Sequence, residues 1–374
     1  MAIRQEAVRA RRNRGSRART VGIVGAASGV GRVLAERLAV AQGVKKVVAI
    51  DSERGDAGEN TGGVTWRVLN PTDPAIVSRL SGCDIVVHTA ISLDLTDDVE
   101  ERSRTNVRGT QTVLTASAAA GVKRVVVVTS AMVYGASPDN PIPLDDDAPL
   151  QAESDGEVLT DLLDIEELCE RAPRSHPGTA VTVVRPATVV GAGIDTALTR
   201  HFEAPRLLMV RGSSPRWQFC HVDDLAAALE LVVLEDLDGP LTVGCDGYLE
   251  AAQVEEVSRR SHIELPSSFV FGTAQRLHRI GMTPAPSAEL HYVTHPWVVS
   301  SARLRAAGWS PEHDNASALT DLMTEVSGRH ALASRRIGRR ETATAATIGA
   351  AGATVAILGT AVAVRKARRR KRSS

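Results

Sequence analysis

One stretch, VGIVGAASGVGRVLAERL from Val21 to Leu38, constrains this chain more than any other. It starts as a short apolar run, breaks at three glycines and then continues in a helical pattern. This order predicts a strand, a tight turn and a helix N-terminus. Small residues in such a turn let backbone N–H groups approach a pyrophosphate, and the helix dipole favours its negative charge. The residues predicted to bind phosphate are Gly25, Ser28, Gly29, Val30 and Gly31.

A second feature supports this interpretation. The next apolar run, Val44 to Ile50, ends in Asp51, about twenty residues after Gly31, where a dinucleotide fold places the acid that binds the adenosine ribose. Because the spacing is GxxxGxG rather than GxGxxG, a glycine-rich loop followed by a turn aspartate is the alternative. Asp51 would repel a 2′-phosphate, whereas the nearby Arg54 is a residue type that accommodates one. NAD is therefore the predicted cofactor, and NADP is the less favoured one.

The following segments alternate between strand and helix patterns. Apolar runs at Val64 to Leu69, Asp84 to His88 and Lys123 to Ser130 are separated by helical segments. The last of these runs is too apolar for a sheet edge. The alternation predicts an α/β fold, in which a Rossmann-type doubly wound parallel sheet carries helices on both faces.

Charge and cysteine content add further limits. The net charge is zero, yet Met1 to Arg19 carries seven arginines against one glutamate, and Arg365 to Arg372 has seven basic residues in eight. The four cysteines form no CxxC pair and the ten histidines show no HExxH or other metal spacing, so neither a disulfide framework nor a metal site is predicted. The N-terminus has no apolar segment, which argues against a secretory signal and favours a disordered arm.

A series of motifs, taken in order, resembles the extended short-chain dehydrogenase/reductase family of the NAD-dependent epimerase/dehydratase type. The motifs are GAASGVG, the strand ending in Asp51, DIVVHTA, TNVRGT, TSAMVYG, VTVVRPATVVG, FCHVDDL and SSARLRAAGWSP. They extend over roughly Arg19 to Val326. This set is specific for the fold and much less specific for a substrate.

The resemblance implies roles for the matching residues. The three turn glycines and Asp51 would bind the pyrophosphate and the adenosine ribose, Asn70 would lie by the adenine, and Ala90 would present backbone near the second ribose. Ser130 matches the active-site serine, with strand termination as the alternative, and Pro186 matches the turn beside the nicotinamide. Residues expected to have structural roles are Asp223 or Asp224 as a helix cap, His221 and Trp217 in packing, and His291 and His295 at the surface or in packing.

The chain departs from the family where its proton chemistry is expected. The family carries a tyrosine and, four residues later, a lysine on the helix after the Ser130 strand, and the lysine lowers the tyrosine pKa. The equivalent segment, near Asp155 to Arg171, contains neither residue, and no lysine occurs between Lys123 and Lys366. The acids of this segment are expected to form a solvated face. Tyr134 is the second, less favoured catalytic candidate.

The resemblance and the changes in composition predict six regions. These are a basic disordered arm (1–19), an NAD(P)-binding Rossmann domain (20–191 with 217–247), an interleaved substrate-side lobe (192–216 with 248–327), a linker (328–342), a membrane-helix candidate (343–364) and a basic tail (365–374). The lobe is expected over the carboxyl ends of the strands, where ligands bind in open α/β sheets.

The C-terminal tail favours membrane association. Ala343 to Val364 is uncharged and just long enough to span a bilayer, but its alanine, glycine and threonine residues insert weakly. The basic cluster beyond it prefers the cytosol, as does a nicotinamide-binding domain, so an interfacial helix on anionic lipid avoids that conflict. The alternatives are a disordered tail or a basic patch for nucleic acid. The expected location is the cytoplasm, or the cytoplasmic face of the membrane.

Two classes of function compete. The first is an oxidoreductase, epimerase or dehydratase acting on a sugar nucleotide or a similar hydroxyl compound. The second is a catalytically impaired nucleotide sensor or membrane-associated regulator that retains the cofactor fold. The expected partners are a dinucleotide, a small-molecule substrate, an anionic membrane surface and a second copy of the chain in a homodimer, with no specific nucleic acid.

Overall fold

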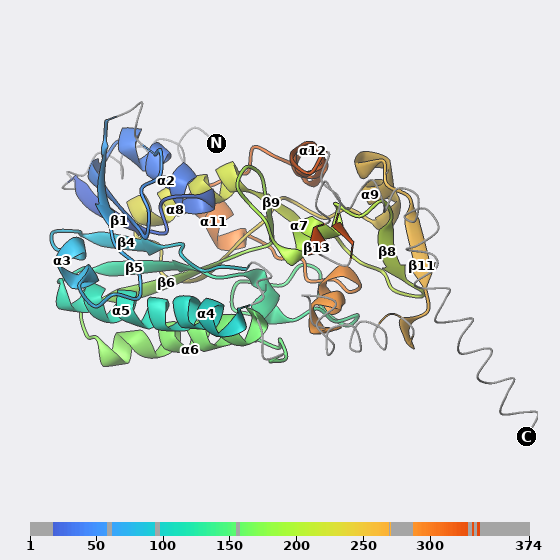
Figure 1. The fold of residues 1–374 in the computed structure, drawn as a ribbon, viewed down its shortest axis with the longest axis horizontal. Coiled ribbons are helices and arrows are strands. Elements are labelled where there is room, and N and C mark those ends of the chain that lie inside the picture. Colours follow the sequence, from blue (N-terminus) through green and yellow to red (C-terminus); the bar gives the residue numbers. More distant parts are fainter. Residues whose placement is uncertain are drawn as a thin grey trace, which may run out of the picture.

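The protein, described here from a computed structural model, is built on a seven-stranded parallel sheet (Figure 1). The described residues are 18–57, 62–93, 98–154, 158–268, 270, 287–327, 331–332 and 335–336. The strand order is β3-β2-β1-β4-β5-β6-β10. The strands are β1 (Arg19–Val24), β2 (Val44–Asp51), β3 (Val64–Val68), β4 (Ile85–His88), β5 (Arg124–Val128), β6 (Ala180–Pro186) and β10 (Gly239–Val243).

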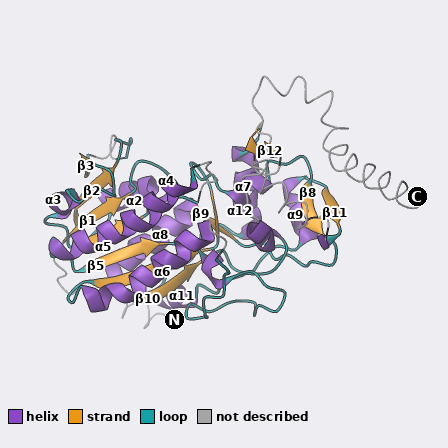
Figure 2. Ribbon diagram, turned by 60° about the horizontal axis from the view of Figure 1, so that its bottom comes forward, coloured by secondary structure: helices purple, strands orange, loops and turns teal. Residues whose placement is uncertain are grey.

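Helices cover both faces of this sheet (Figures 1 and 2). One face carries α2 (Gly29–Val40) and α8 (Val222–Glu235), with α11 (Ala302–Ala307) beside α8; the other carries α3 (Ile76–Leu80), α4 (Val99–Ser103), α5 (Gly109–Ala119) and α6 (Val158–Ser175). Because side chains alternate along a strand, Val47 and Ala49 join one hydrophobic core and Val48 and Ile50 join the other. The predicted doubly wound α/β fold is confirmed.

A smaller lobe lies beyond one end of the sheet (Figure 2). It contains α7 (Ala197–His201), α9 (Ala251–Ser258), the 3-10 helix η3 (Ser287–Val293) and the parallel pair β8 (Leu207–Val210) and β11 (His262–Leu265). A second parallel pair, β7 (Thr188–Val190) and β9 (Phe219–His221), contacts α12 (Asn315–Glu325). The chain leaves the sheet for this region after β6 and after β10, so the lobe stands at the carboxyl ends of the parallel strands.

The remaining described elements are short. They are the π-helical turn η1 (Arg104–Arg108), the 3-10 turn η2 (Ala131–Tyr134), and the antiparallel pair β12 (Ala331–Leu332) and β13 (Arg335–Arg336). Most of the predicted N-terminal arm, the predicted membrane helix at 343–364 and the basic tail lie outside the described residues. Among the described helices, none has both the length and the apolar character needed to cross a membrane.

Candidate functional site

The glycine turn lies between the end of β1 and the start of α2. Gly25 follows β1 with φ of +92°, and Gly29 opens α2 with φ of +51°. A Cβ atom on Gly25 would lie 2.5 Å from the Ala90 nitrogen, and one on Gly31 would lie 1.9 Å from the Gly25 oxygen. Neither contact is sterically allowed, so this turn requires glycine to pack against the loop after β4. The predicted turn residues and Ala90 are therefore neighbours in space.

The N-terminus of α2 has the electrostatics of an anion site. Ser28 is the exposed N-cap residue, its side chain makes no capping hydrogen bond, and the first turn of the helix contains no acidic residue. Val30 follows in the first turn and is half-buried. The first N–H groups of a helix have no partner within the helix, and the helix dipole places positive charge there. These features fit the pyrophosphate of a dinucleotide.

Asp51 ends β2 and holds the glycine turn through its carboxylate. One oxygen accepts a hydrogen bond from the Ala27 backbone N–H at 2.9 Å, and the other accepts from the Ser52 N–H at 2.7 Å. Arg54 is exposed. An ionised carboxylate has about four acceptor positions, so Asp51 can keep these contacts and still accept from ribose hydroxyls.

Asn70, predicted beside the adenine, lies exposed after β3. Its side-chain oxygen accepts hydrogen bonds from the Thr72 N–H at 2.9 Å and from the Thr72 hydroxyl at 2.8 Å. Because that oxygen already stabilises a turn, it has little remaining capacity to accept from an adenine amino group. The adenine role of Asn70 stays a prediction.

A pocket forms where β5 and β6 meet the lobe, and two predicted site residues line it. Ser130 and Pro186 contribute to its wall, and it encloses about 450 Å³ of space, part of it open to solvent. The Ser130 hydroxyl accepts the Met132 backbone N–H at 3.2 Å. The lining residues are Leu93, Ser130, Met132, Val158, Pro186, Ala187, Thr188, Val189, Thr196, Ala197, Leu198 and Trp297.

Tyr134 does not line this pocket. Its side chain is buried, and its hydroxyl donates to the Asp146 carbonyl oxygen at 2.8 Å and accepts from Arg185 at 2.9 Å. Burial raises the pKa of Tyr134 above its usual value, although the charge of Arg185 opposes that shift. The phenol is thus held inside the core in its protonated form.

The helix α6 confirms the predicted helical segment from Val158 onward, but the expected solvated acidic face is wrong for two residues. Glu166 is buried and accepts two hydrogen bonds from the Arg185 guanidinium, at 2.7 and 3.0 Å, and one from the Thr129 hydroxyl at 2.7 Å. Burial opposes the charge of Arg185, but the hydrogen bonds and charge of Glu166 outweigh it and raise the Arg185 pKa. This buried ion pair fastens α6 to β6.

Asp161 is the second buried acid of α6. Its carboxylate accepts from Arg102 at 3.1 Å and from the Asn106 side-chain amide at 3.1 Å. The same amide donates to the Ser92 carbonyl oxygen, and the Ser92 N–H donates back to the Asn106 side chain. Asn106, from the TNVRGT motif, therefore joins α6 to the loop that carries Ala90. The acids are buried because cations and amides from other elements satisfy them.

Val158 and Thr188 are among the pocket residues that were not predicted from the sequence. Val158, at the first turn of α6, presents an aliphatic side chain to the pocket near Ser130, and Leu162, one turn later, is fully buried. Thr188 lies in the wall with its hydroxyl buried and without a partner among the described residues. The VTVVRPATVVG motif shows that Thr188 follows Pro186 by two residues. That its hydroxyl lacks a hydrogen-bond partner depends on tertiary packing, which the motif does not show.

The expectation that Asp223 or Asp224 caps α8 is wrong. The N-cap is His221, whose Nδ1 accepts the Asp223 N–H at 3.3 Å, whereas the Asp224 carboxylate accepts N–H groups from Glu312 and His313. Trp217 packs in the core against other rings, as predicted.

The two further histidines that were expected at the surface or in packing are His291 and His295. Their rings stack on each other at 5.7 Å between centroids, with His291 exposed.

Comparison with known proteins identifies the family. Residues 21–242 match the model of the NAD dependent epimerase/dehydratase family. This chain belongs to that family. A Streptomyces protein named 3-diazoavenalumate denitrifying reductase is 30% identical over 254 residues, covering 64% of this chain and 80% of its own length. An uncharacterized protein of Mycobacterium tuberculosis is 26% identical over 307 residues, 80% of this chain and 82% of its own.

Solved structures share the epimerase/dehydratase fold with this chain. MoeE5 in complex with UDP-glucose and NAD superposes with a TM-score of 0.62 at 21% identity, covering 82% of this chain and 98% of MoeE5. A UDP-galactose 4-epimerase gives a TM-score of 0.61, also at 21% identity and over the same shares of the two chains. At this level of identity the likeness establishes the fold of this family member alone.

Proposed function

We propose that this family member is an NAD(H)-dependent oxidoreductase that acts on a small, largely apolar substrate rather than on a sugar nucleotide. The observation that carries the proposal is the composition of the pocket beside Ser130. Among the described residues that line it, nine are apolar, three carry hydroxyl groups and none is charged. Proteins commonly recognise phosphate with arginine or lysine, and this described part of the lining offers neither to a nucleotide diphosphate.

The cofactor half of the proposal rests on the glycine turn. The N-terminus of α2 would bind the pyrophosphate, and Asp51 would accept the adenosine ribose hydroxyls and disfavour a 2′-phosphate. When bound, NAD(H) supplies or accepts a hydride. Structural neighbours bind NAD, which supports this choice of cofactor.

The substrate half rests on the hydroxyl groups of the pocket. The Ser130 hydroxyl accepts from Met132, so its own hydrogen is left to orient an electronegative substrate atom. Thr188 would add a second hydrogen bond, because its buried hydroxyl has no partner among the described residues. Neither hydroxyl titrates near neutral pH, so both would position the substrate while the proton comes from water or from the substrate itself.

The relative named 3-diazoavenalumate denitrifying reductase supports a reductase over an epimerase. Epimerases and dehydratases of the usual kind depend on a general acid–base residue, a contribution worth about 10²–10⁴ in rate. Among the described residues of α6, Val158 lines the pocket, and it contributes no ionisable group. This pocket wall is best suited to a reduction in which the substrate takes no proton from the enzyme.

The second candidate is a nucleotide sensor or regulator that binds NAD(H) without turning it over. The same apolar wall of α6 favours it, since a protein that only reports cofactor binding needs no proton donor. The two candidates differ in a single observable: turnover with an apolar substrate.

The deciding experiment combines cofactor binding with a substrate panel. Calorimetry measures NADH affinity, and the absorbance of NADH follows turnover with apolar ketones, aryl diazo compounds, hydroxysteroids and UDP-sugars. We expect turnover within the apolar classes, about tenfold slower in Ser130→Ala and Thr188→Val. Ser117→Ala is the matched control, because Ser117 is a buried hydroxyl on α5 outside the pocket.

The alternatives give different outcomes. Preferred turnover of UDP-sugars contradicts the substrate assignment. Tight NADH binding without turnover anywhere in the panel supports the sensor. Failure to bind either NAD or NADH contradicts both candidates.

A further inference from the structure

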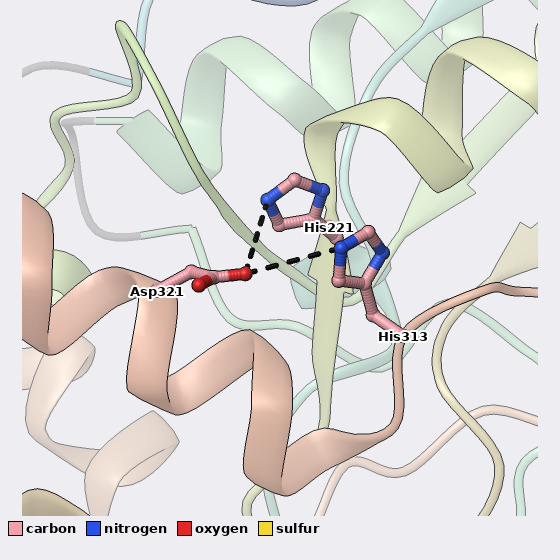
Figure 3. A group of neighbouring side chains, drawn as sticks. All are labelled: His221, His313 and Asp321. Carbon is pink, nitrogen blue, oxygen red and sulfur yellow. Dashed lines mark ion pairs between the residues drawn. The ribbon is translucent and has the colours of Figure 1, made fainter.

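Three potential metal ligands converge at a place separate from the Ser130 pocket (Figure 3). His221 ends β9, His313 lies in the loop before α12, and Asp321 projects from α12 toward both imidazole rings. The Asp321 Oδ2 atom lies 3.8 Å from His221 Nε2 and 3.9 Å from His313 Nε2. These separations exceed hydrogen-bond length, so the three atoms face one another across a gap.

The His313 ring is held with a lone pair toward this gap. Its Nδ1 lies 2.9 Å from Oδ2 of the buried Asp224, and that carboxylate also accepts the backbone N–H groups of Glu312 and His313. A carboxylate can only accept, so Nδ1 donates a ring proton to Asp224 and Nε2 is the atom left to bind an ion beside Asp321. A carboxylate behind a histidine is the usual support of a metal-ligating imidazole.

His221 is prepared in a related way. It is buried, and its Nδ1 lies 3.5 Å from the Asp223 carboxylate and 3.3 Å from the Asp223 backbone nitrogen. In this structure Nδ1 accepts the Asp223 N–H, so binding an ion through Nε2 requires the ring to give up that bond and to carry its proton on Nδ1, beside the Asp223 carboxylate.

The local charge attracts a cation. The carboxylates of Asp223, Asp224 and Asp321 lie within 4 Å of the ring nitrogens of the two histidines. Three negative charges therefore surround the two rings. An ion between the rings and Asp321 would offset this repulsion.

We propose that His221, His313 and Asp321 form a binding site for a divalent zinc ion, with Asp223 and Asp224 orienting the two imidazoles. Two nitrogens and one carboxylate oxygen are a ligand set that zinc accepts, and a water molecule completes a tetrahedron. Magnesium and calcium prefer all-oxygen sites and would bind weakly.

The distances are compatible with such an ion after a small closure. Zinc bonds of about 2.0–2.1 Å place the donor atoms of a tetrahedron about 3.4 Å apart, roughly half an ångström closer than the 3.8 and 3.9 Å found here. The two rings stack with centroids 3.8 Å apart and planes 26° apart, with Asp321 beside them. Because an imidazole nitrogen binds an ion in the plane of its ring, one of the two rings must rotate out of the stack when the ion binds. Asp321 can move to complete the site, because 48% of its side chain is exposed.

The site would have a structural consequence. His221 belongs to β9, whereas His313 and Asp321 belong to the C-terminal segment, about 90 to 100 residues later in the chain. A bound ion would therefore fasten α12 to β9 and add the metal-binding free energy to the stability of the folded state.

The test uses the full-length protein stripped of metal with a chelator and titrated with zinc chloride alone. We expect one zinc ion per chain, a thermal midpoint raised by several degrees, and with cobalt(II) the intense visible absorption of a tetrahedral site. Asp321→Asn should weaken zinc binding at least tenfold, and His313→Gln with Asp321→Asn should abolish it. Glu325→Gln is the matched control, since Glu325 is an exposed acid on the same helix.

The result is decisive in either direction. Absence of stoichiometric binding overturns the proposal, as does an affinity that the Asp321 and His313 substitutions leave unchanged. A paired His291→Gln and His295→Gln variant serves as a second control. Loss of zinc binding in that variant alone would assign the ion to the other stacked histidine pair. The far-ultraviolet circular dichroism of each variant establishes that the fold is retained.

Discussion

The buried ion pair between Glu166 and Arg185 gives the sharpest prediction about the core. The exposed fractions of the two side chains are 5% and 9%, and two hydrogen bonds of 2.7 and 3.0 Å join them. Removing one partner leaves the other charge buried without compensation, which costs about 3–5 kcal/mol of the free energy of unfolding. We therefore expect Glu166→Leu and Arg185→Met each to destabilise the protein by about that amount.

The double variant Glu166→Leu with Arg185→Met separates the energy of the ion pair from the other interactions of the two side chains. With both charges gone, the large penalty for an unpaired charge disappears, and what remains is the loss of partners for Thr129 and Tyr134. The coupling energy of the double-mutant cycle should be about 2 kcal/mol or more. Urea unfolding followed by circular dichroism measures all four proteins.

A matched control lies on the same helix. Glu167 and Arg171 form an i,i+4 pair at 3.2 Å, but their side chains are 60% and 55% exposed. Solvent screens such a pair, so its coupling energy should not exceed about 0.5 kcal/mol. Equal coupling in the buried and exposed cycles would refute the reasoning, and so would an NADH affinity that collapses in a folded Glu166→Gln variant.

Three further predictions concern the cofactor turn and the buried histidine of β4. Gly31→Ala should weaken NADH binding in calorimetry by at least about a hundredfold, because its Cβ would lie 1.9 Å from the Gly25 oxygen, whereas Gly121→Ala, at a glycine with open space around it and a φ of +77°, should change stability alone. Asp51→Asn should reduce the preference for NAD over NADP, measured as the ratio of dissociation constants, since the charge that repels a 2′-phosphate is lost; an unchanged ratio contradicts the ribose assignment. Burial lowers the pKa of His88 from 6.5 to about 4, so the unfolded state binds more protons between these values and stability falls as the pH is lowered through that window, by about 2 kcal/mol at pH 5; His88→Gln should remove that share in urea unfolding at pH 5 and 7.5.

Local pattern was sufficient to predict the sheet and its turn. The run from Val21 to Leu38 contains its own strand, glycines and helix, and each is determined by residues close in sequence. A sheet that is covered by helices on both faces has long apolar strands. Such strands are visible in single segments of the sequence, such as Val44 to Ile50. These properties can be predicted from the sequence because they depend on spacing and composition.

The buried acids were mispredicted because their burial depends on partners from distant elements. Asp161 reads as one more charge on an acidic helix, and only Arg102 and Asn106, both more than fifty residues earlier in the chain, make it an interior residue. Glu166 offered a better signal. Arg185 interrupts an otherwise apolar strand pattern, and a buried arginine requires a carboxylate on a neighbouring element.

The histidine cluster shows the same limit more strongly. His221 and His313 are 92 positions apart by their residue numbers, so no spacing motif of the kind that predicts zinc sites connects them. The aspartate that orients His313 had been assigned to a helix cap. Capping is a local interaction that sequence predicts well, whereas a carboxylate bound to a loop 88 and 89 residues away is a product of the packed fold.

The charges around the pocket bear on the source of the proton that a reduced substrate takes up. On α6 the two acids that could have served as proton donors point into the core, one to Arg185 and the other to Arg102, and both are fully engaged there. The described residues that face the pocket from these two elements are Val158 of α6 and Thr188 and Val189 of β7, none of which titrates. When a substrate accepts a hydride in this pocket, only the hydroxyls of Ser130 and Thr188 are placed to stabilise the charge that develops on it. A ketone reduced there would depend on these two hydroxyl groups to stabilise its developing oxyanion. We therefore expect the proton of the product to come from water or from the substrate, while the acids of α6 stabilise the core.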